Sequence, residues 1–316
     1  MCQPSDILTA MMIYHFARAL RPRQWIKNAV VFAPLVFQGV LFNPAYFSKA
    51  FLAFLYFCGV ASASYLINDI WDVDRDRLHP IKRNRPIASG DLPVRVAWFA
   101  VAVLFGILLP TAFFVVGKYF GIVLLLYVFL QIAYNLKLKN IIIVDALTIS
   151  IGFILRAFAG ALAIPLSISS WLILAITGVS LLLAFGKRRA ERTLLEAQGI
   201  SKESTRSILR HYPDNLLDSM ISMSASFSII TYSLFAFQVS PENSVVRELG
   251  SYIPSTLLSA KLLMLTIPLV IYGVARYLYV IYEKREGESP ERVLLDDKPL
   301  FYTAIIWIIS VILITS

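Results

Sequence analysis

Residues 51–77 read FLAFLYFCGVASASYLINDIWDVDRDR, an apolar run that ends in a cluster of acids. The run is about 20 residues long, which is the length that a helix needs to cross a bilayer. If the helix continues through the acids, Asp69, Asp72 and Asp76 lie within about 60° of one another and Asp74 points away. Three carboxylates at the C-terminal end of a helix repel one another and oppose the helix dipole, so a cation is expected among them.

The acid spacing favours Mg²⁺ carrying a substrate diphosphate, because Mg²⁺ binds carboxylate and phosphate oxygens. An EF-hand loop beginning at Asp72 is excluded. Its sixth position is Arg77 where the loop requires glycine, and its twelfth is Arg83 where the loop requires glutamate. The remaining alternative is a solvated loop at the membrane edge, in which the acids pair with Arg75 and Arg77.

The composition is that of a polytopic membrane protein. Of the 316 residues, 58% are hydrophobic and 16% are charged, whereas soluble domains are roughly half apolar and roughly a quarter charged. The net charge of +9 is therefore interpreted through membrane topology, and no nucleic-acid partner is expected. The only cysteines, Cys2 and Cys58, give no disulfide framework, and the scattered histidines suggest no zinc site.

Nine apolar segments predict an all-α polytopic protein with about nine transmembrane helices. Residues 1–25 are expected to form an amphipathic interfacial segment, because apolar side chains of residues 7–20 fall mostly on one helical side. Residues 26–316 are expected to form a single transmembrane domain, since the connecting loops are short. Pro34 and Gly39 interrupt the first segment. The predicted spans are 27–43, 46–67, 94–116, 119–136, 141–164, 168–186, 217–238, 258–281 and 299–315.

The placement of Lys and Arg predicts the orientation of the chain. With the N-terminus inside, 23 of the 29 Lys and Arg residues fall on the inner side and four on the outer side, as the positive-inside rule requires. The other two, Arg156 and Arg276, lie within predicted spans. The acid cluster and the basic segment 187–189 then share the inner side, so the sequence predicts an active-site pocket that faces the cytoplasm.

Two motifs carry a resemblance to a known family. Asn68-Asp69-x-x-Asp72-x-x-x-Asp76 after the second predicted span resembles the first Asp-rich motif of the UbiA-type intramembrane prenyltransferase superfamily. More narrowly, two segments resemble its polyprenyl-phosphate (decaprenyl-phosphate) phosphoribosyltransferase branch, and the resemblance covers nearly the whole chain. The segments are Arg21-Pro22-Arg23-Gln24-Trp25-Ile26-Lys27-Asn28 and Asp76-Arg77-x-His79-Pro80-x-Lys82-Arg83-x-Arg85-Pro86-Ile87-Ala88-x-Gly90.

The resemblance implies a Mg²⁺-dependent pentosyltransferase of the bacterial inner membrane. Such an enzyme moves 5-phosphoribose from phosphoribosyl diphosphate to a polyprenyl phosphate and releases diphosphate, which feeds the synthesis of arabinose donors for the cell wall. The alternative is a UbiA-type prenyltransferase that moves an isoprenyl chain from a prenyl diphosphate to an aromatic or other acceptor. A transporter fits less well, because the acids stand at the edge of a span and not at mid-bilayer. Self-association into a homo-oligomer stays an open alternative.

The segment after the sixth predicted span separates the two enzyme hypotheses. Aromatic prenyltransferases of this superfamily carry a second Asp-rich motif there, whereas this chain has Lys187, Arg188 and Arg189. A basic site suits a bare anion, such as a lipid phosphate or a sugar 5-phosphate, better than a second metal. Ordinary enrichment of basic residues on the inner side is the other interpretation.

The resemblance and the charge pattern together assign candidate site residues. Asp69, Asp72 and Asp76 are expected to hold Mg²⁺ and the diphosphate and to be catalytic, because ribosyl transfer depends on stabilising the departing diphosphate. The acceptor phosphate is already anionic, so no Ser–His or Cys–His nucleophile is expected. The expected substrate-binding residues are Lys27, Asn68, Lys82, Arg83, Arg85, Tyr134, Lys137, Lys187 and Arg188.

Arg156 lies within the fifth predicted span, about 16 Å deeper than Asp145. An arginine at that depth is costly and is expected to face the interior of the helix bundle. Two roles stay open from the sequence: Arg156 binds a substrate anion, or it pairs with an acid.

Overall fold

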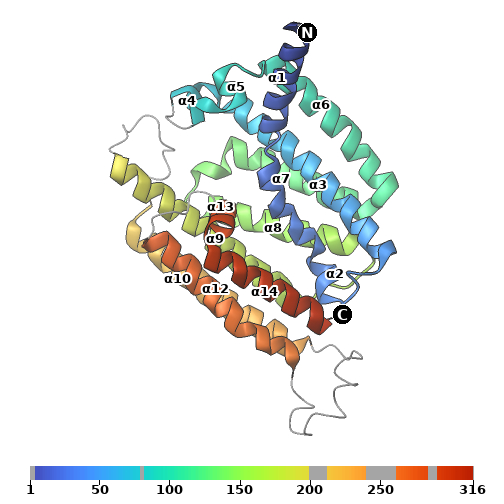
Figure 1. Ribbon diagram of the computed structural model, residues 1–316, viewed down its shortest axis with the longest axis vertical. Coiled ribbons are helices and arrows are strands. Elements are labelled where there is room, and N and C mark those ends of the chain that lie inside the picture. Colours follow the sequence, from blue (N-terminus) through green and yellow to red (C-terminus); the bar gives the residue numbers. More distant parts are fainter. Residues whose placement is uncertain (1–3, 79–81, 199–211, 240–260, 284–289, 316) are drawn as a thin grey trace.

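The computed structural model describes residues 4–78, 82–198, 212–239, 261–283 and 290–315, which are nearly all helical and contain no strand. Eight of the described helical segments are long and apolar enough to cross a bilayer. This confirms the predicted all-α polytopic membrane fold (Figure 1). The segments are α3 (Pro44–Trp71), α6 (Val94–Thr111) with η3 (Ala112–Val116), α7 (Lys118–Leu136), α8 (Val144–Ala163), α9 (Ser170–Gln198), α10 (Asp214–Gln238), η6 (Leu262–Thr266) with α12 (Ile267–Tyr282), and α14 (Lys298–Thr315).

The segment predicted as the first span, 27–43, is built differently. It falls in the 3-10 helix η1 (Pro22–Phe32) and the short α2 (Ala33–Phe37), and turns follow. Pro34 stands in the first turn of α2, where its missing N–H costs no hydrogen bond, and Gly39 takes a left-handed φ of 67° just beyond the helix end. This segment is not among the eight candidate spans, so the count of nine is not confirmed.

The N-terminal residues form α1 (Pro4–Ala19), where the sequence predicts a helix. α1 packs on α3 and α5 (Pro86–Ser89) and lies at the top of the molecule in Figure 1. Its exposed side chains include Met11, Met12, Ile13 and Tyr14. An apolar surface of this kind suits a membrane interface, and the interfacial position of α1 stays a prediction.

Two departures from helix geometry shape the end of the bundle that carries the acids. α3 ends at Trp71, and the next residue, Asp72, leaves the helical region with a φ of −95° and a ψ of 7°. The chain continues through α4 (Val73–Leu78), η2 (Lys82–Asn84) and α5. Directly before η1, Arg21 adopts a left-handed φ of 54°, which costs a non-glycine residue roughly 1–2 kcal/mol. The turn at Arg21 starts η1 close to the acids.

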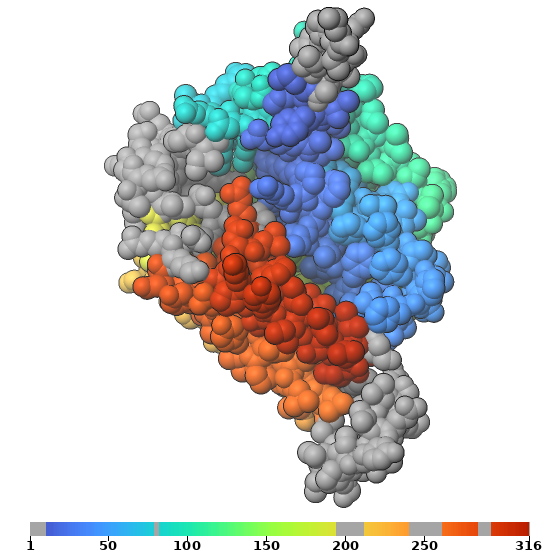
Figure 2. Space-filling view, in the orientation of Figure 1, coloured from blue at the N-terminus to red at the C-terminus, as the bar shows by residue number. Residues whose placement is uncertain are grey.

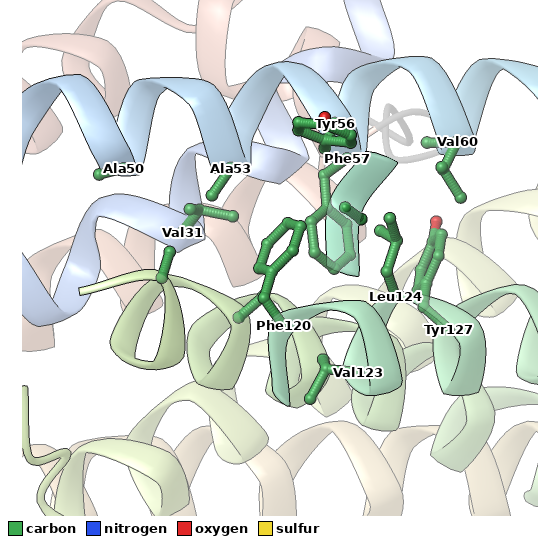
Figure 3. Packing of buried hydrophobic residues seen from close by; sticks show 14 of the residues in the cluster. Val31, Ala50, Ala53, Tyr56, Phe57, Val60, Phe120, Val123, Leu124 and Tyr127 are labelled. Carbon is green, nitrogen blue, oxygen red and sulfur yellow. The ribbon is translucent and has the colours of Figure 1, made fainter. Parts of the chain in front are cut away.

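One hydrophobic core joins η1, α3, α7 and α8. Figure 3 shows Phe57 of α3 between Phe120 and Tyr127 of α7, with ring centroids 6.1 Å and 5.2 Å away. η1 approaches α8 so closely that a Cβ at Gly160 would overlap the carbonyl oxygen of Val31. This contact requires glycine and fixes η1 against the middle of the bundle.

A second core joins α8, α9, α10, α12 and α14 around residues such as Phe185 and Ile221. α14 also contacts α2, so the C-terminal helix lies against a segment near the N-terminus of the chain. Figure 2 shows the N-terminal residues in blue and the C-terminal helix in red side by side on one face. α8 takes part in both cores and connects the two groups of helices.

Candidate active site

Two of the predicted acids face one another across a single guanidinium. Nη1 of Arg85 lies 3.0 Å from Oδ1 of Asp69 and 2.5 Å from Oδ2 of Asp76, and Arg21 also pairs with Asp69. Asp69 and Asp76 are each only 3% exposed. Burial raises the pKa of the Asp76 carboxyl, and the nearby Arg85 charge offsets part of that rise. Two buried acids that share one cation form a site suited to a positively charged ligand.

Asp72 faces a different cation. Both of its carboxylate oxygens lie 3.0 Å from Nζ of Lys139, in η4 (Leu138–Asn140), and Arg75 lies 3.8 Å away. Among the residues that the structure describes, no group of three or more His, Cys, Asp or Glu side chains is close enough to hold a metal. The full ligand set of Asp69, Asp72 and Asp76 therefore stays a prediction. Asp74 points away as predicted, and its side chain is 92% exposed.

Asp69 and Asp76 fit a divalent ion. The Arg85 nitrogen occupies a position within 3.0 Å of an oxygen of each. These two residues would hold such an ion, because carboxylate oxygens are the ligands that Mg²⁺ prefers.

The predicted substrate-binding residues differ in exposure. Lys27, Asn68, Lys82 and Arg85 are half-buried, whereas Arg83 and Lys137 are exposed. The Lys82 charge acts on Asp76 and opposes the rise in its pKa. Residues 82–84 form a 3-10 turn. The side chains of Arg83 and Arg85 therefore point in different directions. Of these two arginines, Arg85 contacts the acids.

A buried ionic network joins α7, α8 and α9. Arg188 donates from Nε to Asp145 Oδ2 at 2.6 Å and from Nη1 to Glu191 Oε2 at 2.6 Å. Its Nη2 donates to the Tyr134 hydroxyl at 3.1 Å. The Tyr212 hydroxyl donates to Asp145 at 2.6 Å, and burial together with this hydrogen bond raises the pKa of Tyr212.

The charge of Arg188 is thus matched by two carboxylates. Arg188 is 1% exposed and Asp145 is 0% exposed. The neighbouring Lys187 is partly exposed and lies 3.8 Å from Glu191. A phosphate bound to Arg188 would have to compete with these acids, and the assignment of Lys187 and Arg188 to an anion site stays a prediction.

Three residues that organise this end of the bundle are outside the predicted site set: Arg21, Lys139 and Asp145. Arg21 belongs to the motif Arg21–Asn28, and its charge next to Pro22 is the sequence feature that could have identified it as a site residue. Lys137 and Lys139 are both basic residues at the end of one span. The short η4 turn buries Lys139 and leaves Lys137 exposed, and no sequence pattern distinguishes the two.

We expect Lys139→Gln to lower the free energy of unfolding by about 1–3 kcal/mol, because Asp72 loses a partly buried charged partner. The matched change Lys137→Gln, at an exposed position, is expected to stay within about 0.5 kcal/mol of wild type. Equilibrium unfolding of the purified variants in detergent measures both. Equal effects at the two positions would contradict the pairing of Lys139 with Asp72.

The fold and the site define a polytopic helical membrane protein with a buried ionic site, built of carboxylates and guanidinium groups, at one end of its bundle. The model of the UbiA prenyltransferase family matches residues 29–188. The chain belongs to this family, which confirms the resemblance seen in the Asp-rich motif.

Relatives and solved structures agree with this membership. The chain is 33% identical to the decaprenyl-phosphate phosphoribosyltransferase of Corynebacterium glutamicum over 98% of this chain and 88% of that protein. It is 34% identical to the protein of the same name from Mycolicibacterium smegmatis, over 97% of this chain and 94% of that protein. A UbiA homolog from Archaeoglobus fulgidus bound to GPP and Mg²⁺ matches with a TM-score of 0.68 and 17% identity, covering 95% of this chain and 99% of that one. The last comparison supports the fold.

Proposed function

We propose that the chain transfers 5-phosphoribose from phosphoribosyl diphosphate to a polyprenyl phosphate, such as decaprenyl phosphate. The bond between ribose C1 and the diphosphate breaks, and C1 bonds to a phosphate oxygen of the lipid. The observation that carries the proposal is identity of 33–34% over nearly the whole chain to relatives named decaprenyl-phosphate phosphoribosyltransferase. The product would serve the synthesis of arabinose donors for the cell wall.

In the proposed reaction, Asp69 and Asp76 would hold Mg²⁺, with Asp72 as the third predicted ligand. Bound Mg²⁺ supplies positive charge that stabilises the departing diphosphate. Arg21 and Arg85, which lie against these carboxylates, would donate hydrogen bonds to diphosphate oxygens. The contacts of Arg85 with both Asp69 and Asp76 support this assignment, since the two acids already share one cation.

The other predicted site residues position the substrates. Lys27, Asn68, Lys82 and Tyr134 are half-buried and are proposed to orient phosphate groups, with Arg83, Lys137 and Lys187 at the exposed margin. The attacking atom is a phosphate oxygen of the acceptor, so the proposal requires no side-chain nucleophile.

The proposal places the protein in a bacterial inner membrane with the acid-bearing end toward the cytoplasm. Residues 1–25 form the interfacial segment and residues 26–316 the transferase domain. The support is the excess of Lys and Arg on that side.

Cysteine labelling tests this orientation in a background that lacks Cys2 and Cys58. Ser89 is exposed beside the acid cluster, and Ala45 is exposed at the opposite end of α3. Helices of that length rise about 40 Å. We expect a membrane-impermeant thiol reagent, added to intact cells, to label Ala45→Cys and to spare Ser89→Cys until the membrane is opened. The reverse pattern would overturn the orientation.

The reaction itself is tested by supplying purified protein and Mg²⁺ either with phosphoribosyl diphosphate and polyprenyl phosphate or with a prenyl diphosphate and an aromatic acceptor. We expect diphosphate release from phosphoribosyl diphosphate that requires both the lipid and Mg²⁺. Consumption of prenyl diphosphate together with an aromatic acceptor, while phosphoribosyl diphosphate is left intact, would replace the proposal with prenyl transfer.

A further inference from the structure

Two arginines lie buried inside the bundle, and their partners differ. Arg188 contacts two carboxylates at 2.6 Å. Arg156 of α8 is 5% exposed and donates to Asn28 Oδ1 at 2.7 Å, to the Gly152 carbonyl oxygen at 2.8 Å and to the Tyr127 hydroxyl at 2.8 Å. All three acceptors are neutral, and no carboxylate within the described residues pairs with Arg156.

The surroundings of Arg156 offset its charge only in part. Its guanidinium carbon lies 4.7 Å from the centroid of the Tyr127 ring and 5.3 Å from that of Phe153, which provides cation–π attraction. A guanidinium has five N–H groups, and three hydrogen bonds from Arg156 to protein acceptors are present. A cation in this apolar interior without a counter-charge is costly, so an anion that reaches it would be held strongly.

The Tyr127 hydroxyl can add a second contact. It accepts a hydrogen bond from Arg156 Nη2, so its own proton stays available for another acceptor. In Figure 3 the Tyr127 side chain rises from α7 toward α3, beside Leu124 and Val60. The hydrogen bond from Arg156 to Tyr127 places a guanidinium and a hydroxyl side by side, and these two groups are usual donors to a phosphate group.

The position of Arg156 relates it to the acid cluster. Arg156 is twelve residues after Val144, the first residue of α8, which is about 18 Å along the helix. Asn28, its partner, lies in η1, and Arg21 at the start of η1 pairs with Asp69. Seven residues of 3-10 helix separate the two points by about 14 Å. η1 therefore runs from the acid cluster to Arg156.

We propose that Arg156, together with Tyr127, binds a phosphate monoester inside the bundle. The identity of the ligand rests on the proposed function, in which both the 5-phosphate of the donor and the phosphate of the lipid acceptor belong to this class. Arg156 then binds one of these two phosphate groups, while Asp69 and Asp76 contribute to the binding of the diphosphate.

Equilibrium binding to the purified full-length protein in detergent tests the proposal with two probes, ribose 5-phosphate and farnesyl phosphate. We expect Arg156→Met to weaken one of them by about tenfold or more, which is the loss typical of a charged hydrogen bond. The probe that is affected identifies the donor 5-phosphate or the lipid phosphate as the source. Arg276→Met is the matched control, because Asp297 already matches the Arg276 charge with two contacts of 3.0 Å, and its affinities should equal those of wild type.

Asn28→Asp gives a second, nearly isosteric test that does not remove the arginine. The new carboxylate would lie against Arg156 Nε, so we expect a higher melting temperature and about tenfold weaker binding of the same probe. A purely structural Arg156 would give the higher melting temperature with unchanged affinity for both probes, which would overturn the proposal. Wild-type protein that binds neither probe would overturn it as well. Binding that depends on Arg156 in a protein that forms no phosphoribosyl lipid would instead reject the proposed function.

Discussion

Replacing Asp69 or Asp76 with Asn is expected to lower kcat by about three orders of magnitude, the scale of losing a main electrostatic contact to the departing group. Each change removes one of the two carboxylates that share the Arg85 guanidinium. Asparagine keeps the volume of the side chain, so the loss reports charge and metal binding. Steady-state rates at saturating Mg²⁺ and both substrates measure the effect, and melting temperatures confirm that each variant is folded.

Asp74→Asn is the matched control, because it lies in the same segment with a side chain 92% exposed. It should keep most of the wild-type rate. Asp72→Asn tests the third predicted ligand, whose carboxylate lies on Lys139 in this structure. A loss as severe as that of Asp69→Asn would support Asp72 as a ligand. Equal loss at all four acids would contradict the assignment of Asp69 and Asp76.

Arg188→Met is expected to lower the free energy of unfolding by about 3–5 kcal/mol, the range for breaking a buried ion pair by removing one partner. The change leaves Asp145, which is 0% exposed, and Glu191 without the guanidinium that both contact. Unfolding in mixed micelles with increasing denaturing detergent measures the difference from wild type.

Lys187→Met is the control for this experiment, because Lys187 is partly exposed and lies 3.8 Å from Glu191. An exposed pair of this kind contributes about 1 kcal/mol or less. Wild-type stability of Arg188→Met, with weaker binding of an anionic substrate, would contradict a structural network and favour the anion site that the sequence predicts.

Long apolar segments could be predicted from the sequence because burial in a bilayer requires them to be continuous. The span predicted at 119–136 is α7, Lys118–Leu136, and the span predicted at 299–315 is α14, Lys298–Thr315. The segment 27–43 was the exception. Its form depends on Pro34 and Gly39, which the sequence shows, and on the close contact of Val31 with Gly160, which no local pattern contains.

The candidate site likewise has features that could be predicted from the sequence and features that could not. Asp74 and Asp76 point to different sides because residues two apart lie on different faces of the helix α4, whereas α3 ends before Asp72, and this acid faces Lys139. The partners of these acids could not be predicted, since Lys139 is 67 residues from Asp72 and Arg21 is 48 residues from Asp69. Arg188 likewise reaches an acid 43 residues away. Tertiary packing alone sets these pairs.

The most direct test of the central claim follows two labels in one reaction. Purified protein receives polyprenyl phosphate, Mg²⁺ and phosphoribosyl diphosphate that carries radioactive phosphorus either at the 5-phosphate or at the β-phosphate. We expect the 5-phosphate label to enter the lipid fraction and the β-phosphate label to be released into water as diphosphate, and we expect Asp76→Asn to lose both the lipid labelling and the diphosphate release. Label from the β-phosphate in the lipid, or no lipid label with either donor, would contradict phosphoribosyl transfer by this protein.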